Sequence, residues 1–284
     1  MSRMRSLVTG ARGLLGSEIV RWLESTGDEV LAAGSSDLDI RDADAVTRTL
    51  AAFQPDRIFQ CAAFTAVDDA EEQQSLAREV NRDGARNVAE AACDAGVRLV
   101  HFSTDFVFSG DASHPYPPDA TPDPQSVYAT SKLEGELAVQ AAAGDHIVIR
   151  TSWLFGGGGR TFVGAITDRA RQGHPLKVVD DQIGRPTWTR TVAHASEVLS
   201  RMDVQGVHHV ADRGTATWLE LAEYALSLQG IPVDIQGVSS AEWGAPAQRP
   251  AYSVLALEET EALLGARFRT WRETLKRFLE EDAR

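Results

Sequence analysis

Three glycines near the start of the chain constrain its fold more than any other feature. Gly10, Gly13 and Gly16 are spaced G-x-x-G-x-x-G, after an apolar run at residues 5–9 and before an amphipathic run at residues 17–25. A strand, a glycine turn and a helix start are the context that a dinucleotide-binding loop requires. Gly10 allows the sharp turn, Gly13 lets the backbone approach a pyrophosphate, and Gly16 lets the helix pack closely on the strand. We therefore expect a dinucleotide-binding fold to begin here.

Strand and helix patterns alternate through the first half of the chain. This order predicts an α/β fold, a doubly wound parallel sheet of the Rossmann type with right-handed crossovers. We assign residues 1–151 to an NAD(P)-binding Rossmann domain that includes a helix with Tyr128 and Lys132, ending near residue 143. The other elements expected after the glycine turn are strands at residues 29–33, 57–61, 97–102 and 147–151, and helices at 43–53 and 75–95.

The second half of the chain is less regular. We expect residues 152–284 to form mainly a smaller C-terminal, substrate-binding subdomain, interleaved with the first domain because no low-complexity linker separates them. Ser253 is expected to cap a C-terminal helix. The expected elements are helices at 161–172, 192–201, 218–228 and around Leu257 and Leu275, and strands at 176–179, 207–210 and 233–238.

Tyr128 and Lys132 suggest a reaction. Four residues apart on a helix, their side chains lie on one face, one turn apart, although the same spacing also occurs as an ordinary exposed pair. A phenol is a poor acid at neutral pH, and a neighbouring ammonium favours its phenolate. At roughly 4 Å and an effective dielectric near 20, the attraction is on the order of 4 kcal/mol, so we expect Lys132 to lower the pKa of Tyr128. Tyr128 could then protonate an alkoxide that forms as a carbonyl receives hydride.

Polar residues that follow the predicted strands are candidate ligands, because open α/β sheets bind ligands beyond the carboxyl ends of their strands. Thr104 is placed to hydrogen-bond a substrate carbonyl, and Asp105 a sugar-like hydroxyl. Trp153 either stacks on a sugar or base or anchors the core. Small residues at 62–66 suit a backbone that passes under a cofactor, and they are equally consistent with a plain turn.

The cofactor preference depends on the end of the second strand. An NAD-specific site usually has an acidic side chain there for the ribose 2′-hydroxyl, whereas this chain has Gly34, Ser35 and Ser36. Without that acid a 2′-phosphate is not repelled, and Arg12 or the two serines could bind it. We therefore predict NADPH as the cofactor, with NADH as the alternative.

Composition and charge exclude several classes of partner. The formal net charge of −13 and the pI of about 5.0 argue against nucleic acid, since backbone binding needs clustered Lys and Arg. No run approaches the roughly 20 apolar residues of a membrane span, and no apolar signal region follows the basic residues 1–5. The two cysteines lack metal-ligand spacing. We expect a cytoplasmic monomer or homodimer without a metal, in which Arg160, Arg185 or Arg249 would bind an anionic ligand.

Taken together, these motifs resemble those of the extended short-chain dehydrogenases/reductases and, more closely, the dTDP-4-dehydrorhamnose reductase family. The resemblance covers nearly the whole chain, with the motifs in the same order. It rests on Thr9-Gly-x-x-Gly-x-x-Gly16, Ala63-Phe-Thr-Ala-Val-Asp68, Ser103-Thr-Asp-Phe-Val-Phe108, Tyr128-x-x-x-Lys132, Arg150-Thr-Ser-Trp153, Asp181-Gln-x-Gly-x-Pro-Thr187 and Arg249-Pro-x-x-Ser-x-Leu255.

The resemblance implies that NADPH or NADH reduces the C4 ketone of dTDP-4-dehydro-L-rhamnose to give dTDP-L-rhamnose. Tyr128 would be the proton donor, Lys132 would bind the nicotinamide ribose, and Thr104 would orient the carbonyl. Substrate contacts are implied for Val67, Thr104, Asp105, Trp153, Arg185 and Arg249, the last at the diphosphate. Cofactor contacts are implied for Gly10, Arg12, Gly13, Leu14, Leu15, Gly16, Asp39, Ile40, Ala62, Ala63, Thr65, Asn81, Tyr128 and Lys132.

Two departures from the family pattern leave alternatives open. Gly34 lies where some members have an acid, and Phe106 where tyrosine is common. A sugar-nucleotide dehydratase would need a glutamate at position 106. A reductase or epimerase of another nucleotide-linked 4-keto-6-deoxy sugar stays open. So does a non-catalytic, dinucleotide-binding regulatory subunit like that of methionine adenosyltransferase, although intact Thr104, Tyr128 and Lys132 disfavour it.

Overall fold

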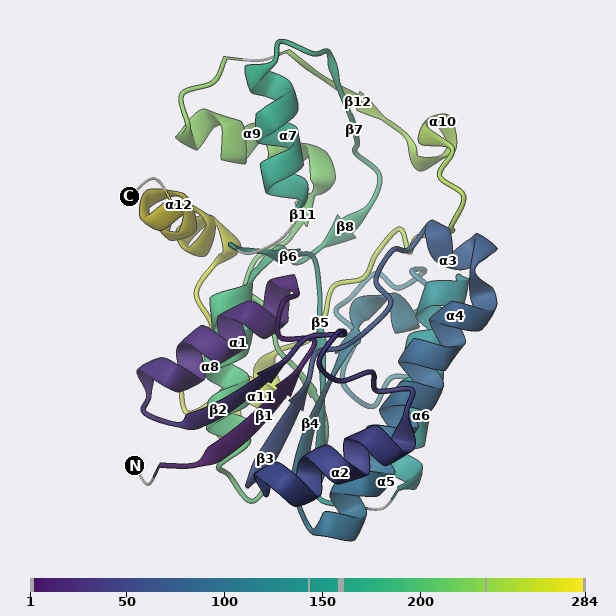
Figure 1. Ribbon diagram of the computed structural model, residues 1–284. Helices are drawn as coiled ribbons and strands as arrows, with labels where there is room; N and C mark the ends of the chain where they lie inside the picture. The colour runs from purple at the N-terminus through teal and green to yellow at the C-terminus, as the bar shows by residue number, and fades with distance from the viewer. Residues whose placement is uncertain (1–2, 143, 158–160, 233, 283–284) are drawn as a thin grey trace.

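A parallel sheet forms the centre of the protein (Figure 1). Within residues 3–142, 144–157, 161–232 and 234–282, which the computed structural model describes, this sheet has six strands in the order β2-β1-β3-β4-β5-β10. The chain passes from β1 to β2 on one side and then to β3 on the other side of β1, so the order reverses between β1 and β3. The strands are β1 (Arg5–Thr9), β2 (Glu29–Ala33), β3 (Arg57–Gln60), β4 (Arg98–Thr104), β5 (His146–Thr151) and β10 (Gly206–His209).

Helices cover both faces of this sheet (Figure 1). Side chains alternate along a strand, so Leu7 and Val8 of β1 are buried on opposite faces, in two separate apolar clusters. Because both faces are buried, the strands carry apolar residues on both faces rather than on alternate positions alone. The helices are α2 (Ala43–Phe53), α5 (Ala85–Ala95) and α6 (Val127–Ala141) on the Leu7 face, and α1 (Leu14–Ser25) and α8 (Thr189–Leu199) on the Val8 face. The predicted doubly wound fold is confirmed.

The second half of the chain builds an upper layer in Figure 1 and also returns to the central sheet. In the upper layer, Leu176 and Val178 pack under Ile166 and Leu226. The chain then re-enters the lower layer through α8, β10 and α11 (Glu258–Leu264). The division at residue 151 stays a prediction. The upper elements are α7 (Phe162–Arg171), β7 (Leu176–Val179), β8 (Ile183–Gly184), β11 (Ala216–Thr217), α9 (Trp218–Leu228), β12 (Ile235–Val238), α10 (Ser240–Trp243) and α12 (Trp271–Asp282).

Short elements join the two layers and adjust the expected boundaries. β6 (Leu154–Phe155) pairs with β9 (Thr187–Trp188), and a 3-10 turn η2 (Asp105–Val107) follows β4.

The predicted helix at 75–95 is interrupted. It consists of α4 (Gln74–Arg78), a π-helical turn η1 (Glu79–Gly84) and α5, with an unexpected short α3 (Asp69–Glu72) before it. Residues 143 and 233, which fell in an expected helix and strand, lie outside the described residues.

Ser253 does not cap a helix. Leu257 precedes α11, with no side-chain cap, and Ser253 instead lies near the Asp105 carboxyl group, where its hydroxyl lowers the pKa of that group. The backbone around Ser253 is extended, since its N–H donates to the Ile183 carbonyl at 2.9 Å. The serine therefore belongs to a segment that crosses between the layers.

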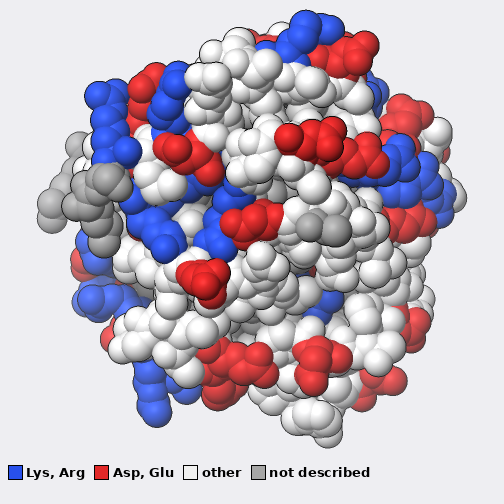
Figure 2. All heavy atoms as spheres, turned by 90° about the horizontal axis from the view of Figure 1, so that it is seen from below, with Lys and Arg blue, Asp and Glu red and all other residues white. Residues whose placement is uncertain are grey.

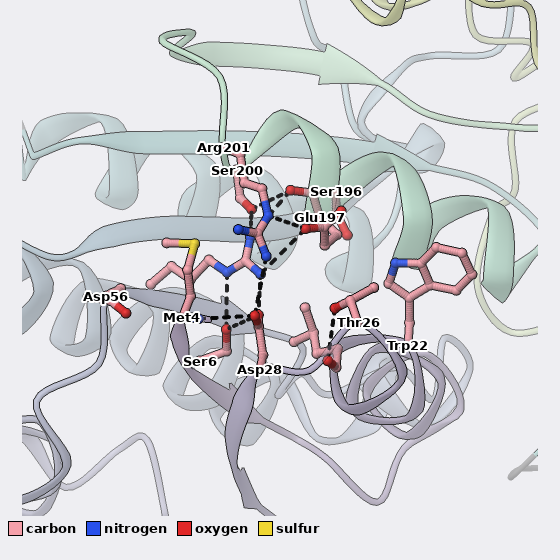
Figure 3. A network of polar contacts seen from close by, with 12 residues as sticks. Met4, Ser6, Trp22, Thr26, Asp28, Asp56, Ser196, Glu197, Ser200 and Arg201 are labelled. Atoms are coloured by element: carbon pink, nitrogen blue, oxygen red, sulfur yellow. Dashed lines mark hydrogen bonds and ion pairs between the residues drawn. The ribbon is translucent and has the colours of Figure 1, made fainter. Parts of the chain in front are cut away.

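A buried charge network ties α8 to the amino-terminal end of the sheet (Figure 3). Arg57 on β3 donates to the Asp28 carboxylate, to the Ser200 hydroxyl and to the Glu197 carbonyl. Arg201 bonds the carboxylates of both Asp28 and Glu197. The side chains of Arg57 and Asp28 are fully buried, so each charge depends on the others for its stabilisation.

The outer surface mixes charges of both signs. On the face seen from below, Figure 2 shows Lys and Arg side chains beside Asp and Glu. Arg98, for example, forms an ion pair of 2.9 Å with Asp145. Within the described residues, no helix has both the length and the apolar character of a membrane-spanning segment. Nor does this part of the chain contain a group of His, Cys, Asp or Glu side chains that could hold a metal ion.

Candidate active site

A cavity of about 1210 Å³ opens at the carboxyl edge of the sheet, where the reversal of strand order predicts a ligand site. Residues of both layers line it, so a ligand there would contact the glycine turn, the ends of β3 and β4, α6 and the upper layer. Most of the predicted site residues meet in this cavity: Gly10, Arg12, Gly13, Leu14, Leu15, Gly16, Asp39, Ile40, Ala62, Ala63, Thr65, Val67, Thr104, Asp105, Tyr128, Lys132, Trp153 and Arg249.

The glycine turn has the geometry that its sequence predicts. Gly10 has a φ of +64°, and a Cβ there would lie 2.6 Å from the Ala62 nitrogen. A Cβ on Gly16 would lie 2.2 Å from the Gly10 carbonyl oxygen. Gly13 precedes α1 and has no side chain with which to cap the first N–H groups of that helix. These groups can therefore bind an anion, and the turn fits the pyrophosphate of a dinucleotide.

Lys132 lies buried beneath the cavity. Ser126 caps α6, its hydroxyl accepting the Ala129 N–H at 3.3 Å, and thereby fixes the start of the helix. One turn beyond Tyr128, the Lys132 ammonium donates to the Phe102 carbonyl at 2.6 Å. Burial lowers the pKa of Lys132 to about 8, and the charge of Glu136, one turn further on, opposes that decrease. Lys132 therefore titrates just above neutral pH.

Tyr128 differs from the expectation. Burial raises its pKa to about 12, the hydrogen bond with Thr104 opposes the increase, and the charge of Asp105 adds to it. The Lys132 ammonium donates to the Phe102 carbonyl, so burial, rather than this charge, decides the pKa of Tyr128 in this structure. The correction leaves Tyr128 protonated at neutral pH, which is the form that a proton donor needs.

Thr104 and Asp105 lie side by side at the end of β4. The Thr104 hydroxyl donates to Asp105 Oδ1 at 3.1 Å and accepts the Phe106 N–H at 3.2 Å. Burial raises the pKa of Asp105 to about 7, opposed by its hydrogen bonds with Ser253 and Thr104. Asp105 Oδ2 is buried and has no partner among the described residues. A buried acceptor in a cavity suits a ligand hydroxyl, as the sequence predicts.

Arg12 lies at the end of β2, where the expected acid is missing. Its guanidinium donates to Ser36 Oγ at 2.9 Å and to Asp37 Oδ2 at 3.0 Å. The Gly34 N–H donates to the same Asp37 oxygen at 2.9 Å. A Cβ on Gly34 would lie 3.0 Å from Arg12 Cδ, so the glycine makes room for the arginine. The Arg12 guanidinium, paired with Asp37, thus lies beside the position where an NAD-specific site has a carboxylate.

Asn81 is not among the residues that line the cavity, and its cofactor contact stays a prediction. Its side chain accepts the Phe64 N–H at 2.8 Å and donates to the Phe64 carbonyl at 3.0 Å and to Ser131 Oγ at 2.9 Å. A Cβ on Gly135 would lie 2.2 Å from the Asn81 carbonyl oxygen, so α6 packs closely on the π-helical turn. Asn81 therefore links the loop after β3, at Phe64, to α6, the helix that carries Tyr128 and Lys132.

The three arginine candidates have different outcomes. Arg249 lines the cavity, and its guanidinium bonds both oxygens of Asp68, at 2.9 and 2.8 Å. Arg185 is buried away from the cavity lining. It donates to the carbonyls of Leu255 at 2.8 Å and Gly214 at 3.0 Å, and its substrate contact stays a prediction. Arg160 lies outside the described residues.

Sequence reasoning missed Trp218, the first residue of α9, which lines the cavity from the upper layer. The local signal was the capping box of Thr217 and Glu220, which marks a helix start but no ligand. Leu76 also lines the cavity without having been predicted. These residues reach it only through the packing of distant segments.

Known proteins resemble the chain over nearly its full length. Residues 4–284 match the family model described as the RmlD substrate binding domain. A dTDP-4-dehydrorhamnose reductase of Mycobacterium tuberculosis strain H37Rv is 39% identical, over 98% of this chain and 93% of its own length. A probable dTDP-4,6-dihydroxy-2-methyloxan-3-one 4-ketoreductase of Streptomyces antibioticus is 40% identical, over 96% and 94%.

A solved structure is also similar over the whole chain. The crystal structure of dTDP-4-dehydrorhamnose reductase from Bacillus anthracis in complex with NADP gives a TM-score of 0.95 at 34% identity, and covers 99% of this chain and 100% of that one. The sequence resemblance is thereby confirmed over nearly every residue. This chain belongs to the RmlD substrate binding domain family, which includes the dTDP-4-dehydrorhamnose reductases.

Proposed function

We propose that this protein is an NADPH-dependent reductase of the C4 ketone of a dTDP-linked 4-keto-6-deoxy sugar, with dTDP-4-dehydro-L-rhamnose as the first candidate substrate. One observation carries the proposal. Tyr128, Lys132 and Thr104 line the same cavity as the glycine turn. The relatives named as reductases of dTDP-4-keto sugars, and the NADP in the Bacillus anthracis structure, support the substrate class and the cofactor. A cytoplasmic monomer or homodimer stays our prediction for its location and assembly.

The residues of this chain would act in a fixed order. NADPH supplies the hydride when it is bound. Thr104 orients the carbonyl, and Tyr128 keeps its proton until an alkoxide develops on the substrate. An alkoxide is a stronger base than a phenolate, so the proton then moves from the Tyr128 hydroxyl to the substrate oxygen. The charge of Lys132 stabilises the phenolate left behind.

Other residues of the same cavity suit the sugar and the nucleotide part of the substrate. Arg249, aligned by Asp68, supplies a cation for a diphosphate. Asp105 Oδ2 supplies an acceptor for a sugar hydroxyl. Phe106 lies edge-on to Tyr128, with ring centroids 6.0 Å apart, and offers no hydrogen bond to the sugar. The identity of the sugar would depend on such wall residues.

The direct test is the oxidation of NADPH in the presence of enzymatically prepared dTDP-4-dehydro-L-rhamnose. Parallel assays use dTDP-4-keto-6-deoxy-D-glucose, a UDP-linked ketosugar and NADH. We expect the fastest oxidation with a dTDP-linked sugar and NADPH. Tight NADPH binding without oxidation by any ketosugar would contradict the proposal and favour the regulatory-subunit alternative.

Arg12→Ala is expected to raise the KM for NADPH about tenfold and the KM for NADH less than about twofold. The guanidinium would bind the 2′-phosphate, and a charged hydrogen bond of roughly 1.5–3 kcal/mol corresponds to a change of this size or larger. Its loss would also leave Asp37 to repel the phosphate. Steady-state kinetics with both cofactors measure the effect, with Arg171→Ala on α7 as the control. Equal changes for the two cofactors would show that Arg12 does not bind the 2′-phosphate.

We expect kcat/KM for NADPH to decrease as the pH rises past about 8, the pKa of Lys132. This ratio reports ionisations of the free enzyme, and deprotonated Lys132 can neither bind the ribose through its charge nor stabilise a phenolate. The charge of Glu136 raises the pKa of Lys132, so Glu136→Gln should move the decrease to lower pH. Glu134→Gln, on the same helix and outside the cavity, should leave the profile unchanged. An alkaline limb at the same pH in Glu136→Gln would rule out Lys132 as the titrating group.

A further inference from the structure

Two stacked tryptophans form part of the cavity wall. Trp153 follows β5, and Trp218 begins α9. Their ring centroids lie 3.6 Å apart, and their planes differ by 4°. Both line the cavity. The stack therefore joins the lower layer to the upper layer at the place where a ligand would contact both.

The backbone of Trp153 is in an unfavourable conformation. Its φ is +46°, in the left-handed region that a bulky side chain rarely adopts. Neighbouring contacts maintain it. The Trp153 carbonyl accepts the Thr187 N–H at 3.1 Å, and the Ser152 hydroxyl donates to the Arg185 carbonyl at 2.7 Å. Strain of this kind persists where the surrounding structure enforces it, and it is found most often at functional sites.

The indole of Trp153 has little freedom to stack on a ligand. One face is covered by Trp218 at van der Waals distance. The ring also lies against Gly184, where a Cβ would be 2.4 Å from Trp153 Cε2. The face on Trp218 is therefore closed to ligands, and stacking of the indole on a sugar or base stays a prediction.

Trp218 is itself held in place. Its Nε1–H donates to Gln182 Oε1 at 3.0 Å, and Gln182 Nε2 donates to Ser240 Oγ at 2.9 Å. The Ser240 hydroxyl and N–H in turn donate to the Asp181 carboxylate, at 2.6 and 2.8 Å. The Phe162 ring packs against the Trp218 ring, with the two ring centroids 4.8 Å apart. Rotation of Trp218 would break this chain of contacts, so its ring is a fixed support.

We propose that Trp218 is a positioning residue for the nucleotide-sugar substrate. It supports Trp153, so that the exposed part of that indole forms a rigid apolar wall beside the sugar. A wall that is ordered before binding loses no side-chain freedom when the substrate arrives, and this improves affinity. Trp218 takes no part in proton transfer. This inference rests on the proposed reductase function and adds a residue that acts through Trp153.

The test is the kinetics of Trp218→Leu with NADPH and the dTDP-linked ketosugar. We expect the KM for the ketosugar to increase about three- to tenfold, the effect of losing an aromatic contact, with little change in kcat or in the KM for NADPH. Trp218→Phe keeps a ring against Trp153 and should recover most of the affinity. Gln182→Met removes the hydrogen bond but not the ring, and should give a small increase. Trp243→Leu, an exposed tryptophan on α10 outside the cavity, is the control.

Near-ultraviolet circular dichroism supplies a readout independent of turnover, because indoles held rigidly against each other contribute a signal that Trp218→Leu should remove and the exposed Trp243→Leu should keep. Loss of the signal with an unchanged KM for the ketosugar would overturn the inference. So would an equal fall in kcat and in affinity for both substrates, which indicates a general structural defect. A wild-type protein that oxidises NADPH with none of the sugars would instead contradict the reductase function itself, so the two failures are distinguishable.

Discussion

Tyr128→Phe is expected to lower kcat roughly 10²- to 10⁴-fold while the affinity for NADPH stays nearly unchanged. Phenylalanine keeps the ring and removes the proton that the developing alkoxide needs. The high pKa of Tyr128, about 12, means that the wild-type hydroxyl remains protonated and ready to donate at neutral pH. Steady-state turnover and a fluorescence titration with NADPH measure the two quantities separately.

Tyr224→Phe is the matched control for this experiment. Tyr224 lies on α9 and packs edge-on against Trp271, outside the cavity. Loss of its hydroxyl should leave turnover unchanged. Normal turnover of Tyr128→Phe would exclude Tyr128 as the proton donor. If turnover and NADPH affinity fell in parallel, the side chain would act in binding rather than in proton transfer.

Arg57→Met is expected to lower the free energy of unfolding by about 3–5 kcal/mol, because it removes the buried cation of Asp28 and leaves both Asp28 and Glu197 with only the partly exposed Arg201. Denaturant titration measures this change. Burial alone would raise the pKa of Asp28, but the hydrogen bonds from Arg57 and Met4 lower it overall. A lowered pKa in the folded state contributes stability above the ordinary value of 3.8 and loses it as the pH falls through the folded-state value. The difference between wild type and variant should therefore shrink in acid.

The control is Arg277→Met on α12. Arg277 forms an ion pair of 3.0 Å with Glu281, and its side chain is 55% exposed, so its loss should change stability by less than about 0.5 kcal/mol. Equal effects of the two substitutions would show that burial adds nothing to the Arg57 network. Since this network lies at the amino-terminal end of the sheet, the KM values of folded Arg57→Met should match the wild type.

The fold could be predicted where one local pattern allows one structure. Gly10, Gly13 and Gly16 were interpretable because a β-α turn that approaches its own helix leaves no room for a side chain. The central strands were recognisable because sheet faces buried on both sides demand continuous apolar runs. Tyr128 and Lys132 share a helix, so their proximity follows from spacing alone.

The interrupted helix shows where such patterns fail. Residues 75–95 have a helical pattern throughout, and one π-helical turn inserts a residue without changing which side chains are apolar. The turn is explained by long-range contacts. Asn81 bonds Phe64 and Ser131, and Gly135 packs against its carbonyl oxygen. No local feature of the sequence encodes those partners.

Arg185 and Arg249 show the same limit for the site. Both arginines have a similar local sequence, since each precedes a proline in a loop. Arg249 meets the carboxylate of Asp68 at the cavity edge, whereas Arg185 meets two backbone carbonyls inside the protein. The pKa of Tyr128 could not be predicted for a related reason. Burial of the phenol decides this pKa, and the nearby Lys132 ammonium donates its hydrogen bond to the Phe102 carbonyl instead.

The return of the chain to the central sheet sets the order in which this protein can mature on the ribosome. β5 gains its outer neighbour only when β10 is synthesised, and the Val8 face of the sheet gains its second helix only with α8. Until residue 209 has emerged, the nascent chain exposes an unpaired strand edge and an apolar face, the features that promote aggregation. Chaperones that shield nascent chains would therefore matter most between the synthesis of β5 and that of β10.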